Sequence, residues 1–127
     1  MRPNFIIAGK LTREYLLPPQ GSPLLDSPGG NLIYTVGGLA VWDKNIGMVA
    51  RITKEYPQEW LSEFQKRGFD IRGIETAEEN FDLRSFIAYT DTHERSHTSV
   101  VSHFARREMT FPKTLLGYQP RDETIKD

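Results

Sequence analysis

The chain has 127 residues, a length that fits one domain, and its 38% hydrophobic and 26% charged content is typical of a globular protein. Its 16 basic and 17 acidic side chains nearly balance, so the charge does not indicate a nucleic-acid or membrane partner. The absence of cysteine excludes disulfides, thiolate catalysis and cysteine-based zinc sites. No apolar run reaches the length of a signal-peptide core or a membrane span, and we therefore expect a soluble cytoplasmic protein.

The N-terminal segments predict a short buried strand followed by irregular chain. Residues 5–9, FIIAG, form an apolar run that ends in glycine, which is typical of a strand buried on both faces of a parallel sheet. Residues 10–17 alternate poorly but can continue as strand until two adjacent prolines. Residues 20–30 contain three glycines, two prolines and two serines, so we expect a loop there.

Residues 31–42 predict the first helix. Asn31 is a good N-cap type, and apolar residues recur on one side at helical spacing. These residues are Leu32, Val36, Leu39 and then Val41 or Trp42. Gly37 and Gly38 each cost about 1 kcal/mol in a helix interior relative to alanine. We expect them to allow close packing of this helix on another backbone.

The next segments continue the alternation of strands and helices. Residues 46–52 predict a second buried strand, and residues 57–67 predict a helix with Pro57 in its first position and Gly68 as its C-cap. Residues 69–74 return to extended chain. This order is typical of an α/β fold with a mostly parallel sheet.

The chain changes character after residue 80. Residues 82–90 and 95–101 are rich in β-branched and aromatic residues, and the link between them is short and polar. We expect a β-hairpin that stands apart from the main sheet. His93 and His97 fall in this region, where a solvent-exposed pair is a better interpretation than a metal site. The tail from residue 109 predicts no regular element.

Gly29, Gly30 and Asn31, at the start of the first predicted helix, are the one local candidate for a binding site. Glycine lets another molecule approach the backbone closely, and the first turn of a helix offers N–H groups to hydroxyl oxygens or anions. The alternative interpretation is an ordinary Pro-Gly-Gly-Asn turn. Glu14 can join such a site, because its carboxylate accepts hydrogen bonds from hydroxyl groups.

The sequence contains no motif for the other common kinds of catalytic or binding site. The chain contains no phosphate-binding P-loop, no dinucleotide-binding glycine motif and no nucleophile elbow. No histidine and carboxylate spacing completes a metal site. The aromatic side chains of Trp42, Trp60 and Phe64 follow helical spacing, so we expect them in the core rather than against a ligand.

Three segments taken together resemble the ribokinase-like (PfkB) family of carbohydrate kinases. Residues 27–52, SPGGNLIYTVGGLAVWDKNIGMVARI, are similar to its Gly-Gly-Asn loop, its small-residue helix and the strand that follows. Residues 57–74 resemble its next helix and turn, and residues 82–100 resemble the small β-sheet that closes over the sugar. The match covers roughly residues 4–101.

This resemblance implies a fold and a set of site residues. The fold is a three-layer α/β sandwich with a mostly parallel sheet and flanking helices, present in part, plus a small β lid. The residues expected to contact sugar or polyol hydroxyls are Gly29, Gly30 and Asn31. Glu14 stands where the family usually has Asp. On the lid strand, Phe86, Ala88 and Tyr89 are candidates to cover the substrate, and we name Phe86 and Tyr89 as site residues.

The chain also departs from the family. Thr53, Lys54 and Glu55 replace the Gly-Asp-Asp that many members have, which indicates a divergent branch. A whole kinase of the family is more than twice as long, and its second half holds the ATP pocket and a Gly-Ala-Gly-Asp motif with the catalytic base. We therefore expect no catalytic residue and no cofactor in this chain, whereas a full-length member would use ATP and Mg.

These points lead to one hypothesis and two alternatives. We expect a single partial domain over residues 1–127, with a lid hairpin at about 82–101, that recognises the sugar of a carbohydrate kinase and is inactive alone. One alternative is a non-enzymatic remnant of such a kinase that binds a ligand or a partner. Because half a sheet exposes an edge and an apolar face, we expect a homo-oligomer. The other alternative is an unrelated small α/β domain.

Overall fold

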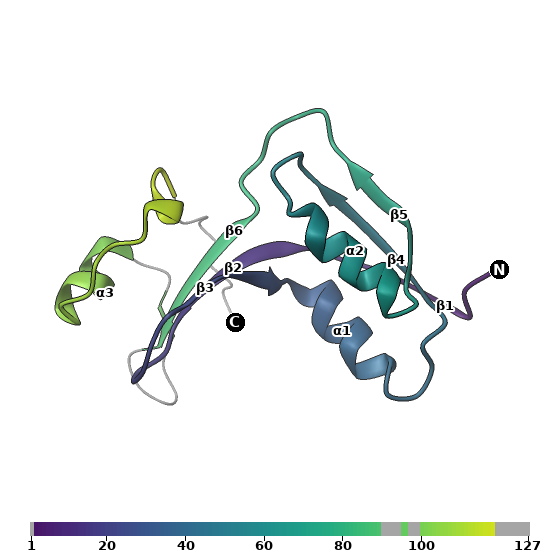
Figure 1. Cartoon of the computed structure of the whole chain (residues 1–127), viewed down its shortest axis with the longest axis horizontal. Coiled ribbons are helices and arrows are strands. Elements are labelled where there is room, and N and C mark those ends of the chain that lie inside the picture. Colours follow the sequence, from purple (N-terminus) through teal and green to yellow (C-terminus); the bar gives the residue numbers. More distant parts are fainter. Residues whose placement is uncertain (1, 90–94, 97–99, 119–127) are drawn as a thin grey trace. The chain divides into compact units, whose positions relative to one another are not determined.

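The computed structural model describes residues 2–89, 95–96 and 100–118 of the chain. The chain divides into two compact units (Figure 1). Unit 1 consists of Met1–Arg13 and Ser27–Leu83, and unit 2 consists of Glu14–Asp26 and Arg84–Asp127. That the two fold together as a single partial domain stays a prediction.

Unit 1 is built on a parallel sheet of three strands. These are β1 (Phe5–Ala8), β4 (Ile46–Ile52) and β5 (Asp70–Thr76), in the order β1-β4-β5. β1 and β4 read as nearly continuous apolar runs, as the strands of parallel sheets do. The expected strands and their parallel arrangement are confirmed, with boundaries that differ by one or two residues.

Two helices, α1 (Asn31–Leu39) and α2 (Gln58–Lys66), pack on one face of this sheet (Figure 1). Side chains alternate along β4, so every second residue from its first to its last points into the layer between sheet and helices. The buried core of unit 1 consists of Leu11, Leu32, Val36, Ile46, Met48, Ala50, Ile52, Tyr56, Phe64 and Leu83. This is the α/β architecture expected from the sequence.

The ends of α2 follow local sequence rules. Pro57 occupies the N-cap position, one residue before the helix begins. At the other end, Gly68 has a φ of 91°, which glycine adopts without strain. Its N–H donates to the carbonyl of Gln65 at 2.9 Å, and Phe69 N–H donates to the carbonyl of Phe64 at 3.1 Å. The C-cap is Arg67, so Gly68 ends the helix one position later than the C-cap expected for it.

The C-terminal end of α1 departs from the prediction. The helix ends at Leu39, so Val41 and Trp42 leave the apolar stripe, and Trp42 is 87% exposed. The expectation that Trp42 belongs to the core is wrong. Gly37 and Gly38 are exposed, and a Cβ added to either would meet nothing within 4 Å. The close packing expected at these glycines is therefore not found among the described residues.

A second sheet has four strands in the order β3-β2-β6-β7. Its strands are β2 (Thr12–Leu17), β3 (Leu24–Gly29), β6 (Arg84–Tyr89) and β7 (Arg95–Ser96). The expectation of a loop throughout residues 20–30 is wrong, because residues 24–29 form β3. Its edge position tolerates Pro28, which lacks a donor for a second neighbour. Asp26 has a φ of 54°, a conformation that Asp adopts more readily than most residues.

The predicted hairpin is confirmed in its first part. β6 pairs antiparallel with β7, with Ala88 opposite Ser96 and Tyr89 opposite Arg95. The expected continuation of the second strand to Val101 is wrong, since helix α3 (Val100–Arg106) begins at Val100. Val100 and Phe104 are four residues apart and both buried, so helical spacing places them together in the core of unit 2.

The core of unit 2 gathers side chains from β2, β6, α3 and the short 3-10 helix η1 (Lys113–Leu115). Its buried members are Tyr15, Leu17, Phe86, Ala88, Val100, Phe104 and Leu115. The Arg107 guanidinium donates to the carbonyls of Pro18 and Gly21, which ties the turn after β2 to the end of α3. Among the residues that the structure describes, no helix is long and apolar enough to cross a bilayer.

Candidate functional site

The candidate site in unit 1 lies where β3 ends and α1 begins. Gly30 is the N-cap residue of α1, with a φ of 98° and a ψ of 159°, and no side chain caps this end of the helix. The first turn carries no acidic residue. Its N–H groups therefore keep the partial positive charge of a helix N-terminus, which favours hydroxyl oxygens and anions.

Gly30 is required by the protein's own backbone. A Cβ at this position would lie 2.3 Å from the carbonyl oxygen of Lys10 and 3.1 Å from the backbone nitrogen of Thr12. The chain leaving β1 thus passes directly against the start of α1. The space that a side chain would fill is occupied by the chain itself, so the glycine positions the helix rather than leaving room for a ligand at that atom.

Asn31 connects the same two segments through its side chain. Its Oδ1 accepts a hydrogen bond from the Lys10 N–H at 2.7 Å, and the Leu32 N–H donates to the Lys10 carbonyl at 3.2 Å. A Cβ at Gly9 would lie 2.8 Å from this Oδ1, so Gly9 is the small residue that admits the contact. Asn31 is therefore the first helical residue, and the expectation that it is the N-cap is wrong.

The consequence for binding is a division of roles within Asn31. Because Oδ1 is engaged by Lys10, the amide Nδ2 is the atom of this side chain that can donate to a ligand. Asn31 is exposed, so such a ligand can reach it from solvent. Gly9 was expected only as the end of a buried strand, and Lys10 was not expected in the site, although a glycine directly after a buried strand is a recognisable signal of close backbone approach.

The position of this site in the sheet is favourable for binding. β1 and β4 are parallel, so their carboxyl ends lie at the same edge of the sheet. Lys10 follows β1 at this edge, and Thr53 follows β4. In open α/β sheets, ligands bind outside the carboxyl ends of the strands.

Two buried hydroxyl groups follow β4. Thr53 Oγ1 and Tyr56 Oη have no hydrogen-bond partner among the described residues. Burial raises the pKa of the Tyr56 phenol, so it stays protonated. Tyr56 N–H donates to the Thr53 carbonyl at 3.1 Å, which closes a turn over Lys54 and Glu55. Sequence reasoning noted this segment only as a departure from the family pattern.

The other predicted site residues belong to unit 2. Glu14 is buried on β2, where alternation along the strand directs it away from Tyr15 and the unit 2 core. Phe86 is completely buried, with its ring centroid 5.7 Å from that of Phe104. Tyr89 is half-buried near the end of β6. The structure thus brings Gly29, Gly30 and Asn31 together in unit 1, and the substrate contacts expected of Glu14, Phe86 and Tyr89 stay predictions.

The histidines give no metal centre in the described part of the chain. His93 and His97 lie outside the described residues. His103 is buried on α3, with its ring centroid 6.2 Å from that of Phe86. No group of three His, Asp or Glu side chains within residues 2–89, 95–96 and 100–118 is arranged to hold a metal ion.

Comparison with known proteins relates this arrangement to a fold. No family model matches the chain. No curated protein matches it. Similar solved structures include a PfkB protein from Polaromonas sp. JS666, with a TM-score of 0.56 and 15% identity. A ribokinase from Cryptococcus neoformans var. grubii serotype A in complex with ADP gives a TM-score of 0.57 and 12% identity. A ribokinase from Thermotoga maritima gives a TM-score of 0.54 and 17% identity.

These three matches share one feature. Each covers 74% of this chain but only 34%, 33% and 35% of the respective solved chain. The chain therefore has part of a ribokinase-like fold, as the sequence resemblance implied. It spans about a third of the length of the solved structures that it matches.

Proposed function

We propose that this chain is the substrate-recognising part of a carbohydrate kinase and binds hydroxyl groups of a sugar or polyol at the start of α1. The observation that carries this proposal is the exposed Asn31 amide beside the uncapped first turn of α1, at the carboxyl edge of the parallel sheet. Its location agrees with the general rule for ligand sites in α/β sheets. The ribokinase-like fold supports a sugar or polyol as the ligand class.

In this proposal Asn31 Nδ2 donates to a ligand hydroxyl. N–H groups of the first turn other than that of Leu32, which already donates to the Lys10 carbonyl, donate to another. Lys10 holds the Asn31 side chain in place, so the donor is already oriented before the ligand arrives. Pre-orientation of this kind reduces the entropy lost on binding. The substrate contacts that the family resemblance implies for Glu14, Phe86 and Tyr89 belong to unit 2 and stay separate predictions.

The described residues do not fit an ATP–Mg site. They offer no cluster of acidic side chains for the metal, and the sequence has no P-loop. We therefore propose that this chain transfers no phosphoryl group and is inactive alone. In a full-length kinase, ATP and Mg would be held by other parts of the protein.

The test compares two amide-to-carboxylate substitutions. Asn31→Asp keeps the acceptor for Lys10 N–H but replaces the Nδ2 donor with a carboxylate oxygen. Gln65→Glu makes the same chemical change on an exposed position of α2 and serves as the matched control. Backbone amide NMR shifts are followed while D-ribose, D-fructose and xylitol are added.

We expect shifts at residues 31–33 with at least one of these ligands, retained in Gln65→Glu and lost in Asn31→Asp. Absence of any shift in the unsubstituted chain, or equal shifts in both variants, would contradict binding at this site. ATP-dependent phosphorylation of a sugar by the purified chain would contradict the proposed inactivity. The sequence also predicts a homo-oligomer, and sedimentation of the chain alone tests that prediction separately.

A further inference from the structure

The outer edge of β1 is open and apolar. Among the described residues, β4 is the only strand that pairs with β1. Phe5 N–H and Gly9 N–H donate toward β4, to the carbonyls of Asn45 and Val49. Since successive residues of a strand alternate in direction, the N–H groups of Ile6 and Ala8 point to the open edge. Phe5–Ala8 contain no charged residue, and Ile6 is 67% exposed.

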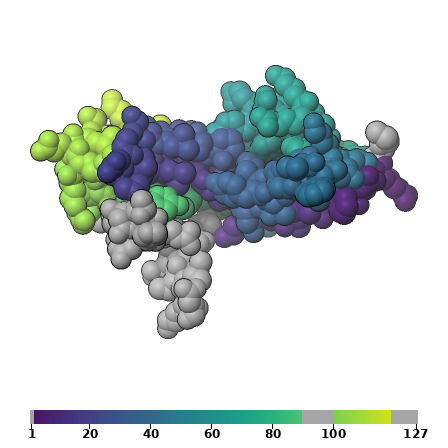
Figure 2. Space-filling view, turned by 90° about the horizontal axis from the view of Figure 1, so that it is seen from below, coloured from purple at the N-terminus to yellow at the C-terminus, as the bar shows by residue number. Residues whose placement is uncertain are grey.

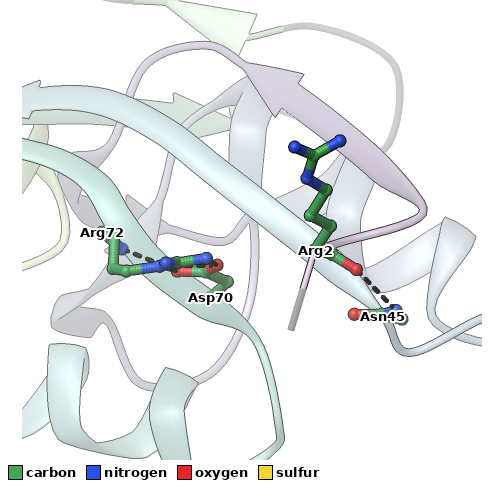
Figure 3. A network of polar contacts seen from close by, with 4 residues as sticks. All are labelled: Arg2, Asn45, Asp70 and Arg72. Carbon is green, nitrogen blue, oxygen red and sulfur yellow. Dashed lines mark hydrogen bonds and ion pairs between the residues drawn. The ribbon is translucent and has the colours of Figure 1, made fainter.

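The opposite edge of the sheet is protected in the usual way. β5 carries Asp70, Arg72 and Glu75 within seven residues. Arg72 Nη2 lies 2.5 Å from Asp70 Oδ2 in an ion pair on the strand itself (Figure 3). Charged side chains on an edge strand discourage pairing with another chain. The two edges therefore differ, and β1 lacks the protection that β5 has.

The apolar surface continues from this edge onto the sheet face that α1 and α2 leave uncovered. The register places Ile6 beside Gly47 and Ala8 beside Val49, on the side opposite the helices. Val49 on this face is 39% exposed, whereas Gly47 is buried, and a Cβ there would lie 3.0 Å from Cγ of Pro3. Figure 2 shows the purple N-terminal segment of unit 1 open at the surface beside the blue helix α1. Strands of parallel sheets are normally covered on both faces.

We propose that the β1 edge and the adjoining face of Ile6, Ala8 and Val49 together form an assembly surface for a polypeptide that completes the ribokinase-like sheet. The partner supplies an apolar strand parallel to β1 and a helix that covers the face. Parallel strands are connected through crossover helices, so one β–α segment provides both elements. The matched solved chains support this occupant, because about two-thirds of each lies outside the match.

A second copy of the chain fits this surface less well. A twofold dimer through β1 would pair the strands antiparallel and extend the sheet, but the apolar face of each copy would stay uncovered. Pairing centred on β1 would also bring Arg2 near Lys10 of the second copy, and both side chains are cationic and exposed. A β–α segment satisfies the edge and the face without this repulsion.

The experiment uses a defined probe. The probe is the part of the Thermotoga maritima ribokinase chain that lies outside the matched region, produced as a separate polypeptide. The matched third of that ribokinase is the positive control, which establishes that the probe is competent to bind. Binding to the present chain is measured by titration calorimetry, and hydrogen exchange of the Ile6 and Ala8 amides reports whether the β1 edge becomes paired.

Two matched variants locate the contact. Ile6→Lys places a charge on the proposed surface, and Val101→Lys makes a similar change on α3, where Val101 is 62% exposed. Burial of a lysine charge against apolar groups is costly, so we expect Ile6→Lys to weaken probe binding by about tenfold or more. Val101→Lys should leave binding unchanged, and the Ile6 and Ala8 amides should exchange more slowly in the complex.

Three results would overturn the proposal. The first is failure of the probe to bind this chain while it binds its own matched third. The second is binding that Ile6→Lys does not weaken. The third is sedimentation of the chain alone as a dimer that Ile6→Lys dissociates, which would assign the surface to a second copy. Sugar binding at α1 is read out separately, so either proposal can fail without the other.

Discussion

Gly30→Ala tests how the start of α1 is built. Gly30 has φ 98° and ψ 159°, a backbone region that is almost confined to glycine. The added Cβ would lie 2.3 Å from the Lys10 carbonyl oxygen and 2.9 Å from its carbonyl carbon. Both neighbours are backbone atoms, which cannot turn aside as a flexible side chain can.

The expected loss of stability follows from two costs. A non-glycine residue in this backbone region costs about 1–3 kcal/mol. Forcing an extra carbon into a packed position costs about 1–3 kcal/mol more. We therefore expect Gly30→Ala to lower the free energy of unfolding by about 3 kcal/mol or more, a large fraction of the roughly 5–15 kcal/mol of a typical domain.

Gly37→Ala is the matched control, because it makes the same chemical change in the same helix. A Cβ at Gly37 meets nothing within 4 Å, and its backbone is helical. Alanine should stabilise the helix there by about 0.5–1 kcal/mol. Urea denaturation followed by tryptophan fluorescence measures both variants, since Trp42 and Trp60 both belong to unit 1.

The two variants should change the urea midpoint in opposite directions with little change in the slope. A Gly30→Ala chain as stable as the unsubstituted chain would refute the close contact between Lys10 and the start of α1. Equal destabilisation by Gly37→Ala would instead show that the exposed side of α1 is covered in solution.

Substitutions at two further residues test other contacts. Two hydrogen bonds from Arg72, the larger effect from its side chain and the smaller from its backbone N–H, hold the pKa of Asp70 at about 2, below its ordinary value of 3.8. This contribution to stability is present above pH 3.8 and is lost as the pH falls through about 2. A carbon-13 NMR titration of Asp70 should show that Arg72→Gln raises the pKa of Asp70 part of the way towards 3.8. An unchanged pKa would contradict the ion pair. Phe86→Ala should destabilise unit 2 by about 3–5 kcal/mol, and Phe86→Leu by much less. Hydrogen exchange of the α3 amides measures both effects. Equal effects of the two substitutions would show that the Phe86 ring is not packed as described.

The sequence predicted much of unit 1 because its signals are local. The apolar run of β1 and the Pro57 and Gly68 signals around α2 act within a few residues of where they occur. β3 was missed for the opposite reason, since Pro28 and its neighbours resemble a loop and become a strand only by pairing at a sheet edge. Whether Trp42 is buried or exposed likewise depends on where α1 ends.

The candidate site likewise combines features that the sequence predicts with features that only the tertiary structure decides. The sequence alone marked Gly29, Gly30 and Asn31 as the segment to examine, because adjacent glycines before a helical pattern are visible in one dimension. Only the tertiary structure decided what those residues do, since Lys10 and Asn31 are 21 positions apart and meet where β1 leaves the sheet. The glycine is needed where the two backbones meet, and Asn31, which is exposed, holds Lys10 through its Oδ1.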